Sequence, residues 1–493
     1  MPLFHGVGLR LVLAVTCLMV GCRTPQRASI ATIEPSPRAD VGLARINNEA
    51  ETEEAASSIQ PVVHETGEVM TFADQSDVDD PFAGAAELLL ESLIASVQSR
   101  NPSLQAAQAA WAAASERFPQ AVALDDPMLQ TMFGPATFSS NSPTQSSYVL
   151  GMAQRVPWHG KRELKGQMAQ WDAAATAWDS HEVQLRLEAA TRIAFFDYYL
   201  VVRELELNRR NVDVTQAFRS TAKAKYEANL VSKQDLSLAD LELAKLEQER
   251  LELDRSGLIA VARINTLLHR RPDHPLPAPP DRLEVSENLS NVVELREMAI
   301  QQRPELASLS AKIQSEQNAV ALACKEYYPD FEFMGRYDSY WTDTVQRPMI
   351  GMNMNIPLNQ SRRAAALREA QFRVSKLVAE HAQQQDAIRE EVQIAYARAD
   401  ANRKAAALYE NRILPAAETN LDSARAAYIA GSIDFLSLMS ARREFIGQQI
   451  GYQRTLAEYH RSRADLQRAV GRQVSQIVDR SPLAEPIPVT TEP

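Results

Sequence analysis

The sequence predicts a mainly α-helical protein with two short β-hairpins, each followed by a very long helix. Ala, Leu, Glu, Gln and Arg dominate the 493 residues, whereas only 17 are Gly and 6% are aromatic. This composition is typical of long helices with narrow contacts. Two strand-like stretches interrupt it, YVLGMAQRVPW at 148–158 and MIGMNMNIPL at 349–358, in which large side chains alternate before a proline.

The two stretches belong to an internal duplication. Gly151 and Gly351 are 200 residues apart, whereas the flanking motif NPSL (101–104) precedes RPEL (303–306) by 202 residues. The segment 226–243 matches 428–445 with the same offset of 202. Each copy predicts the order helix, strand, strand, long helix, shorter helix.

The long helices are expected over about 161–228 and 362–430 and should each be on the order of 100 Å long. Pro415 should kink the second one, because proline removes a backbone hydrogen bond. In the second helix, Ile388, Val392, Ala395 and Ala399 form a narrow apolar seam, as expected of helices packed side by side.

The N-terminus predicts export and lipid attachment. An apolar run at 11–20 is followed by Gly21 and Cys22, which indicates a signal peptide over 1–21. The ending LMVGC resembles a bacterial lipobox with Cys22 as the acylated, palmitate-carrying residue. The alternative is an ordinary signal with a chance cysteine. No second run is long enough for a transmembrane helix. Cys324 is expected to be buried in a helix.

The rest of the chain divides by composition and by the repeat. We expect a disordered, lipid-anchored tether at 22–84, repeat 1 at 85–278, an inter-repeat equatorial segment at 279–302, repeat 2 at 303–472 and a flexible tail at 473–493.

The hairpins have the pattern of membrane strands, with one apolar face and one polar or small face over about ten residues. Four strands cannot close a barrel, and lipid does not tolerate open strand edges. Several copies of the chain must therefore contribute strands to one barrel, and the helices must continue it as a hollow rod. Trp158, Tyr340 and Trp341 at strand ends suit an interfacial aromatic belt. The membrane-strand residues are Met128, Met132, Tyr148, Leu150, Met152, Val156, Phe331, Phe333, Ile350, Met352, Met354 and Ile356.

Over about 85–472 the chain resembles the TolC family of outer-membrane efflux proteins. The resemblance depends on the duplicated helix starts, the proline-ended strands and LPAAETNLDSARAAYIAGSIDFLSLMSARR, which is similar to the family's second-repeat signature. It implies a homotrimer with a 12-stranded β-barrel in the bacterial outer membrane and an α-helical barrel in the periplasm. The partners implied are outer-membrane lipid, a periplasmic adaptor protein and an inner-membrane transporter.

The function implied is passive conduction, as the exit duct of a tripartite efflux pump, without enzymatic activity or cofactor. Two alternatives stay open: the exit duct of a type I protein secretion system, and a coiled-coil lipoprotein that bridges envelope layers without a pore. The transported substrate is not predicted.

The resemblance places adaptor docking and the gate at the two helix–turn–helix tips, where ordinary loops are the alternative. Family members often carry acidic residues just past the tip, and Asp235 matches that position, although it could also be a helix N-cap. Serines occupy the matching positions of the second copy. The tip and gate residues are Asn229, Leu230, Val231, Asp235, Gly431, Ser432, Ile433, Asp434, Ser437 and Ser440.

Other functions find little support in the sequence. A net charge of −11 argues against nucleic-acid binding. Met349, Met352 and Met354 could suggest a path for soft metal ions, but strand packing explains them better. The histidines are scattered and no catalytic constellation stands out, so neither a metal site nor a catalytic residue is expected.

Overall fold

The computed structural model describes residues 81–82, 84–134, 147–228, 232–285, 289–341 and 344–471. All of them belong to one compact unit, Phe72–Pro493. Cys22, the tether before residue 81, the tail after residue 471 and the tip residues Asn229, Leu230 and Val231 lie outside the described residues.

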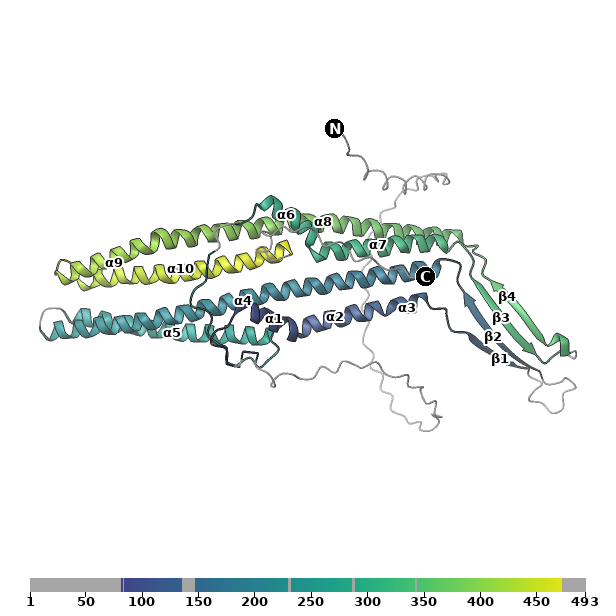
Figure 1. Ribbon diagram of the computed structural model, residues 1–493, viewed down its shortest axis with the longest axis horizontal. Coiled ribbons are helices and arrows are strands. Elements are labelled where there is room, and N and C mark those ends of the chain that lie inside the picture. The colour runs from purple at the N-terminus through teal and green to yellow at the C-terminus, as the bar shows by residue number, and fades with distance from the viewer. Residues whose placement is uncertain are drawn as a thin grey trace, which may run out of the picture. The chain divides into compact units, whose positions relative to one another are not determined.

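Both repeats contain the predicted order of elements (Figure 1). Repeat 1 comprises α1 (Leu90–Arg100), α2 (Pro102–Ser115), α3 (Arg117–Val122), β1 (Met128–Phe133), β2 (Tyr148–Val156), α4 (Lys161–Glu227) and α5 (Lys233–Leu267). Repeat 2 comprises α6 (Val292–Gln302), α7 (Pro304–Lys325), β3 (Phe331–Asp338), the 3₁₀ turn η3 (Thr344–Gln346), β4 (Pro348–Met354), α8 (Gln360–Leu408), the π-helical turn η4 (Tyr409–Ile413), α9 (Leu414–Ile429) and α10 (Phe435–Val470).

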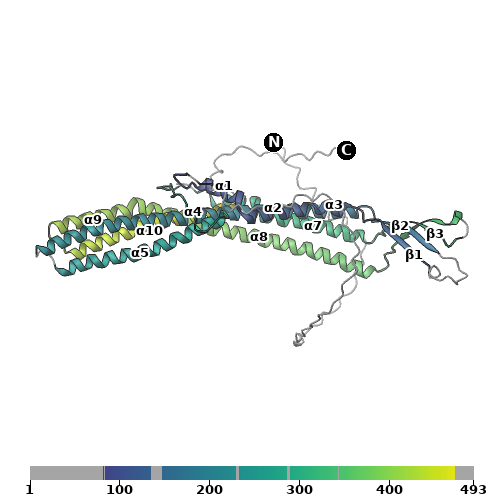
Figure 2. The ribbon, with the colours of Figure 1, turned by 90° about the horizontal axis from the view of Figure 1, so that it is seen from below.

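The long helix α4 connects two groups of helices. It packs against α2, α3 and α7 along the part that leaves the strands, and against α5 and α10 along the part that leads to the tips (Figures 1 and 2). The helix starts follow local sequence signals: the Asn101 side chain accepts a hydrogen bond from Ser103 N, and Pro102 occupies the first helical position.

The duplication extends to the buried cores. Leu93, Val97, Leu104, Ile264 and Leu268 are at most 5% exposed, and so are their counterparts 202 residues later. The counterparts are Leu295, Ala299, Leu306, Leu466 and Val470. Apart from Leu104, each set packs with its own long helix, so both copies bury the same short helix against the same end of the last helix. The predicted seam Ile388, Val392, Ala395 and Ala399 is confirmed in the second core.

The second long helix is interrupted where proline predicted a kink. α4 continues for 67 residues, whereas α8 gives way to the π-helical turn Tyr409–Ile413 immediately before Pro415. A π turn takes up residues that an α-helix of the same path does not need. This turn lies in the stretch over which the repeat offset changes from 200 at the strands to 202 at the tips.

The four strands form one antiparallel sheet in the order β1-β2-β3-β4. The hairpins of the two repeats meet at β2 and β3, where Gly151 lies opposite Arg336. Among the described strands, β1 and β4 are the edges of the sheet.

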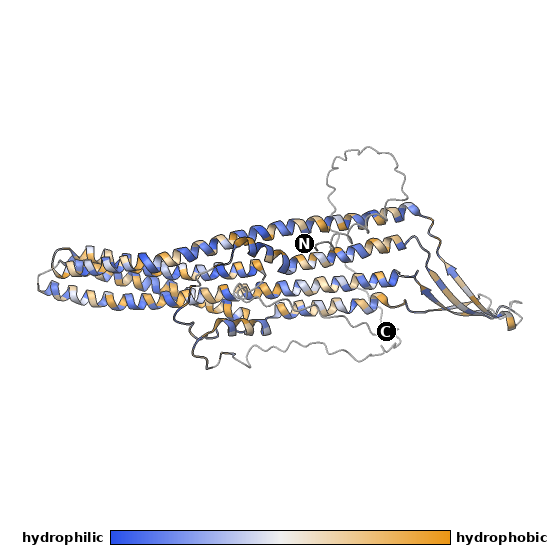
Figure 3. Ribbon diagram, turned by 45° about the horizontal axis from the view of Figure 1, so that its top comes forward, coloured by the Kyte–Doolittle hydropathy of each residue, from blue (hydrophilic) through white to orange (hydrophobic). Residues whose placement is uncertain are grey.

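Polar and apolar residues alternate along the long helices (Figure 3). Within the described residues, no helix combines the length and apolarity needed to cross a membrane. The predicted burial of Cys324 is wrong: this residue of α7 is a free, exposed cysteine, because its side of the helix faces away from the contacts that α7 makes with α4 and α8.

Candidate functional site

One face of the sheet is apolar and exposed. Residues paired directly across antiparallel strands share a face, so the register places Leu150 beside Tyr337, and Met152 beside Gly335 and then Ile350. Ile350 is 96% exposed, and no other described residue covers it. The predicted residues on this face are Tyr148, Leu150, Met152, Val156, Phe331, Phe333, Ile350, Met352 and Met354, while Ile356 follows β4 and is also exposed.

Two predicted residues lie on the other face. Met128 pairs with Ala153 and Met132 with Val149, so both share the face opposite to Leu150 and Met152. Leu129 and Phe133, 67% and 64% exposed, take the apolar positions of β1 instead. The sequence could not show this, because both faces of β1 carry large apolar side chains. Only the pairing of β1 with β2 decides which of the two faces joins the exposed apolar face of the sheet.

The second face is mostly polar or small. It carries both charge signs, with Arg155, Glu332, Arg336 and Asp338 on neighbouring positions. Glu332 accepts a hydrogen bond from Asn353 Nδ2 at 3.1 Å. We call this the inner face; its other residues are Met128, Gln130, Met132, Val149, Gly151, Ala153, Met334, Met349, Gly351 and Asn353.

Aromatic rings lie at both ends of the sheet, as predicted. Trp158 stacks on Tyr328 with ring centroids 5.2 Å apart at the helix end. Tyr340 and Trp341 contact each other at the loop end, with centroids 6.2 Å apart. Such rings have one apolar body and one polar handle, which suits a boundary between lipid and water.

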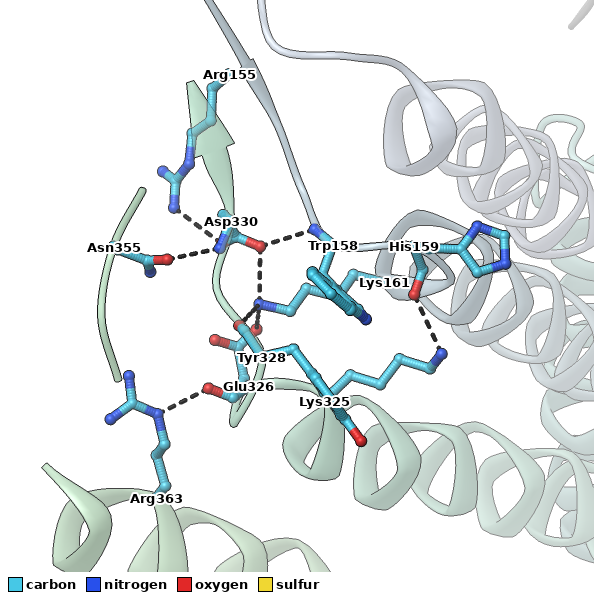
Figure 4. A network of polar contacts seen from close by, with 10 residues as sticks. All are labelled: Arg155, Trp158, His159, Lys161, Lys325, Glu326, Tyr328, Asp330, Asn355 and Arg363. Atoms are coloured by element: carbon cyan, nitrogen blue, oxygen red, sulfur yellow. Dashed lines mark hydrogen bonds and ion pairs between the residues drawn. The ribbon is translucent and has the colours of Figure 1, made fainter. Parts of the chain in front are cut away.

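A buried ion pair joins the two repeats where strands pass into helices (Figure 4). Lys161 Nζ, at the start of α4, lies 2.9 Å from Asp330 Oδ1 and 3.3 Å from Glu326 Oε1. Asp330 also accepts a hydrogen bond from Trp158 N at 2.9 Å, and Arg155 Nη2 lies 3.3 Å from its other oxygen. The side chains of Lys161 and Asp330 are only 3% and 11% exposed.

This junction was missed from sequence, because Lys161 and Asp330 are far apart in the chain and neither belongs to a motif. The network also reaches the second long helix, since Arg363 Nε donates to Glu326 O at 2.7 Å. The start of both long helices is therefore tied to the segment that links α7 to β3.

The first tip is only partly described. Asp235 is half-buried in the first turn of α5. The alternative that it caps the helix is wrong, since Ser232 holds the N-cap position and makes no capping hydrogen bond. Negative charge in a first helical turn is favoured by the helix dipole.

The second tip is a tight turn. Gly431 has φ = +75°, a conformation that glycine adopts readily, and Ser432 N donates to Ala427 O at 2.9 Å. Asp434 is the N-cap of α10 and accepts a hydrogen bond from Ser437 N at 2.9 Å. The hydrogen bond from the Ser437 side chain, and then the one from its amide, lowers the pKa of the Asp434 carboxyl. Ser437 and Ser440 are exposed and Ile433 is half-buried.

The two tips share a small core. Phe435 and Met439 of α10 pack with Ala239 of α5, and Phe218 of α4 contacts this cluster. The guanidinium of Arg442, 6% exposed, lies 5.2 Å from the Phe218 ring centroid. Two ion pairs continue this contact between α4 and α10, Arg454 with Glu204 at 2.7 Å and Arg461 with Asp197 at 2.6 Å.

A buried histidine lies in a cavity of about 300 Å³ between α1, α4 and α10. His460 stacks on Phe196 with ring centroids 4.8 Å apart. Burial, and then the charge of Arg463, lowers the pKa of His460 to about 4. The ring is therefore neutral at ordinary pH.

Comparison with known proteins supports the arrangement. Residues 295–472 match the family described as outer membrane efflux protein. No curated protein matches the chain.

Several solved structures have the same fold. The outer-membrane channel OprN has 18% sequence identity and a TM-score of 0.67, over 80% of this chain and 96% of its own. CusC has 15% identity and a TM-score of 0.68, over 78% and 92% of the two chains. The outer membrane protein VceC of Vibrio cholerae has 18% identity and a TM-score of 0.66, over 78% and 96%.

These structures combine an α-helical barrel with a β-barrel. The family match covers repeat 2, and repeat 1 has the same elements and the same buried positions. The predicted fold class and the resemblance are thus confirmed: residues 295–472 match the outer membrane efflux protein family, and the chain has the fold of the solved outer-membrane channels.

Proposed function

We propose that this protein is the outer-membrane exit duct of a tripartite efflux pump. Three copies would close a 12-stranded barrel in the outer membrane, with the helices continuing it as a tunnel into the periplasm. Conduction is passive, and energy comes from an inner-membrane transporter joined to the tunnel by a periplasmic adaptor.

The observation that carries the proposal is the sheet itself. It has two unpaired edge strands, an apolar exposed face and a polar opposite face. Unpaired strand edges are costly in lipid and are removed when β1 of one copy pairs with β4 of the next. Closure of this kind puts Leu150 and Ile350 toward lipid and the inner face toward a water-filled bore.

The duplicated helices support the same assembly. Within the chain, α4 and α7 meet through polar contacts: Ser308 Oγ donates to Asp179 Oδ1 at 2.6 Å. By the repeat, α8 of one copy should meet α2 of the next in the same way. The residues equivalent to Ser308 and Asp179 are then Ala106 and Ala379, both exposed in the single chain.

Exposed alanines on both surfaces allow close helix approach between copies. Trp111, 48% exposed on α2, and Phe372, 70% exposed on α8, are large apolar side chains that such a contact would cover. Burial of this apolar area would stabilise the trimer at roughly 25 cal/mol per Å².

The membrane anchor and the partner site complete the proposal. Acylated Cys22 would hold the chain in the outer membrane, and the tips around Asp235 and Gly431–Ser440 would dock the adaptor. We expect no ring of free carboxylates at the gate, because Asp434, the acidic group at the second tip, is engaged as a helix cap.

The test is conductance of the purified protein in planar bilayers, together with its migration in detergent before and after heating. We expect discrete channel openings and a heat-sensitive trimer. Substituting Ile350→Glu and Leu150→Glu on the apolar face should prevent insertion, since a charge in the hydrocarbon costs about 2–4 kcal/mol.

A matched control places the same charge on the inner face. Gln130→Glu changes a residue of that face and should leave insertion and trimer formation intact. A soluble monomer without conductance would overturn the proposal and favour the envelope-bridging rod.

A further inference from the structure

The contact between α4 and α10 has an equivalent that involves α5 and α8. Within the chain, α10 packs along α4 through His460, which stacks on Phe196, and through the ion pair between Arg454 and Glu204. By the repeat, α4 corresponds to α8 with an offset of 200, and α10 corresponds to α5 with an offset of 202. The equivalent contact would therefore join α5 to α8.

The face of α5 that this contact needs is uncovered in the single chain. In the described part of the chain α5 packs on α4, and Leu251, Leu258 and Ile259 on its other side are 63%, 73% and 48% exposed. In the view of Figure 1, β1, α2 and α5 lie along one edge of the chain, whereas β4, α8 and α9 lie along the opposite edge. The uncovered face of α5 can therefore meet α8 of a second copy.

The apolar side chains at the equivalent positions fit such a contact. Leu258 takes the place of His460, and Tyr396 takes the place of Phe196. Tyr396 is half-buried and packs against the second core, so its ring is held in position. Packing of the exposed Leu258 on this ring would remove apolar surface from water, which favours the contact.

The ion pair of the within-chain contact returns with its polarity reversed. Arg454 Nε lies 2.7 Å from Glu204 Oε1. The equivalent residues are Glu252 on α5 and Lys404 on α8, and both are exposed. Glu252 forms no ion pair with another described residue, whereas Lys404 pairs with Asp400 one turn earlier in its own helix. The acid and the base have exchanged helices but remain complementary.

We propose that Glu252 of one copy pairs with Lys404 of the next, beside Leu258 packed on Tyr396, and that this interface determines which repeats meet in the assembly. The partner of the uncovered α5 face is thus a second copy of this chain. The inference rests on the proposed function, because head-to-tail contacts of this kind form a closed ring of copies.

The reversed polarity distinguishes the two repeats, which otherwise share a fold. If α5 met α4 of another copy, Glu252 would oppose Glu204. If α10 met α8 of another copy, Arg454 would oppose Lys404. Like charges across an interface disfavour both of these pairings. The proposed pairing is complementary both within each chain and between chains.

The first test cross-links pairs of introduced cysteines in the full-length detergent-solubilised protein with a short bis-maleimide. All variants carry Cys324→Ser, because this thiol is exposed. Glu252→Cys with Lys404→Cys should give covalent dimers and trimers on a denaturing gel. The matched control, Glu204→Cys with Arg454→Cys, should cross-link within one chain and keep the mass of the monomer, because these two residues are in contact there.

The second test measures the temperature at which the trimer dissociates in detergent. Glu252→Lys or Lys404→Glu alone should lower this temperature, because each change places like charges together. The double exchange should restore it, since the pair is then complementary again. Recovery in the double variant separates the pair from a local effect of either substitution on its own helix.

Two results would overturn the interface: absence of covalent dimers and trimers for the first cysteine pair, or failure of the double exchange to restore the dissociation temperature. Conductance of the parent protein is recorded alongside. Either result with a parent that forms trimers and channels would refute this inference alone. A parent without trimers and channels would refute the proposed function.

Discussion

The two repeats have the same fold but bury side chains of different size in their cores. In the long helices, where the offset is 200, Phe195 and Tyr199 of α4 correspond to Ala395 and Ala399 of α8. All four are buried, at 2%, 1%, 7% and 0% exposure. The first core therefore contains large rings, and Phe82 from the segment before α1 packs with them. The second core brings helices together over small side chains.

This difference shows how a duplicated unit acquires distinct roles without changing its fold. Small residues permit close helix approach, whereas rings hold helices apart and need a segment from elsewhere to complete the packing. The first core consequently ties the N-terminal segment to α4 and α5. The second core has no equivalent of Phe82 among its members.

The largest effect should come from removing a ring from the first core. Phe195→Ala leaves a cavity beside Phe196 and Leu268 and should cost about 3–5 kcal/mol, because a buried helix seam relaxes only in part. Thermal unfolding of the detergent-solubilised protein measures the loss. The reciprocal change, Ala395→Phe, overpacks the second core and should cost about 1–3 kcal/mol. If Phe195→Ala were nearly neutral, the two cores would not differ in the way described.

The junction between strands and helices offers the next comparison. Asp330→Ala leaves Lys161 buried with only Glu326 and Tyr328 O as partners and removes the hydrogen bond from Trp158 N. We expect a loss of about 3 kcal/mol, since an uncompensated buried charge is strongly unfavourable. The position equivalent to Asp330 in repeat 1 is Met128, which is 53% exposed.

Met128→Ala is therefore the matched control and should cost less than about 1 kcal/mol. Similar losses in thermal unfolding for the two variants would show that the ion pair adds nothing to this junction. A double change, Lys161→Met with Asp330→Leu, should recover most of the stability, because it removes both buried charges together.

His460, which stacks on Phe196 of the first core, should also make stability depend on pH. The pKa of this ring is lowered to about 4, against 6.5 for an ordinary histidine. The unfolded chain therefore binds a proton more readily than the folded one. The stabilisation of the folded state by the neutral His460 ring is fully present above about pH 6.5 and is lost as the pH falls toward 4. The free energy of unfolding should fall by about 3 kcal/mol in total over this range.

The measurement compares the unfolding temperatures of the wild type and His460→Leu at about pH 7 and about pH 5. The variant should lose less stability on acidification than the wild type, because carboxylates titrate in both proteins but the buried imidazole only in one. An equal loss in both proteins would mean that His460 is already accessible to protons in the folded state.

The sequence was enough for the fold and for much of the site, because both depend on periodicity. Alternation at Tyr148–Val156 and the helical seam at Ile388–Ala399 are local patterns, and the repeat fixed their order. What it could not supply were pairings between distant segments. The register of β1 reversed the faces of Met128 and Met132, and the Lys161–Asp330 pair joins residues that no motif connects. The prediction that Cys324 is buried was wrong for the same reason, since one side of a helix is buried only where another element covers it.

The smallest loss of stability is expected at the helix–turn–helix tips, where the two repeats also differ. Asp434 caps α10 through Ser437 N, whereas Ser232 at the same place before α5 makes no capping hydrogen bond. Asp434→Ala should therefore lower stability by about 1 kcal/mol and Ser232→Ala by only a few tenths. Hydrogen exchange of the first-turn amides of α10 and α5 is the sensitive measurement, since fraying of a helix end affects global unfolding only slightly. Because the amide of Ser437 loses its partner only in the Asp434 variant, faster exchange should be confined to α10; faster exchange in α5 after Ser232→Ala would mean that the two tips are capped alike.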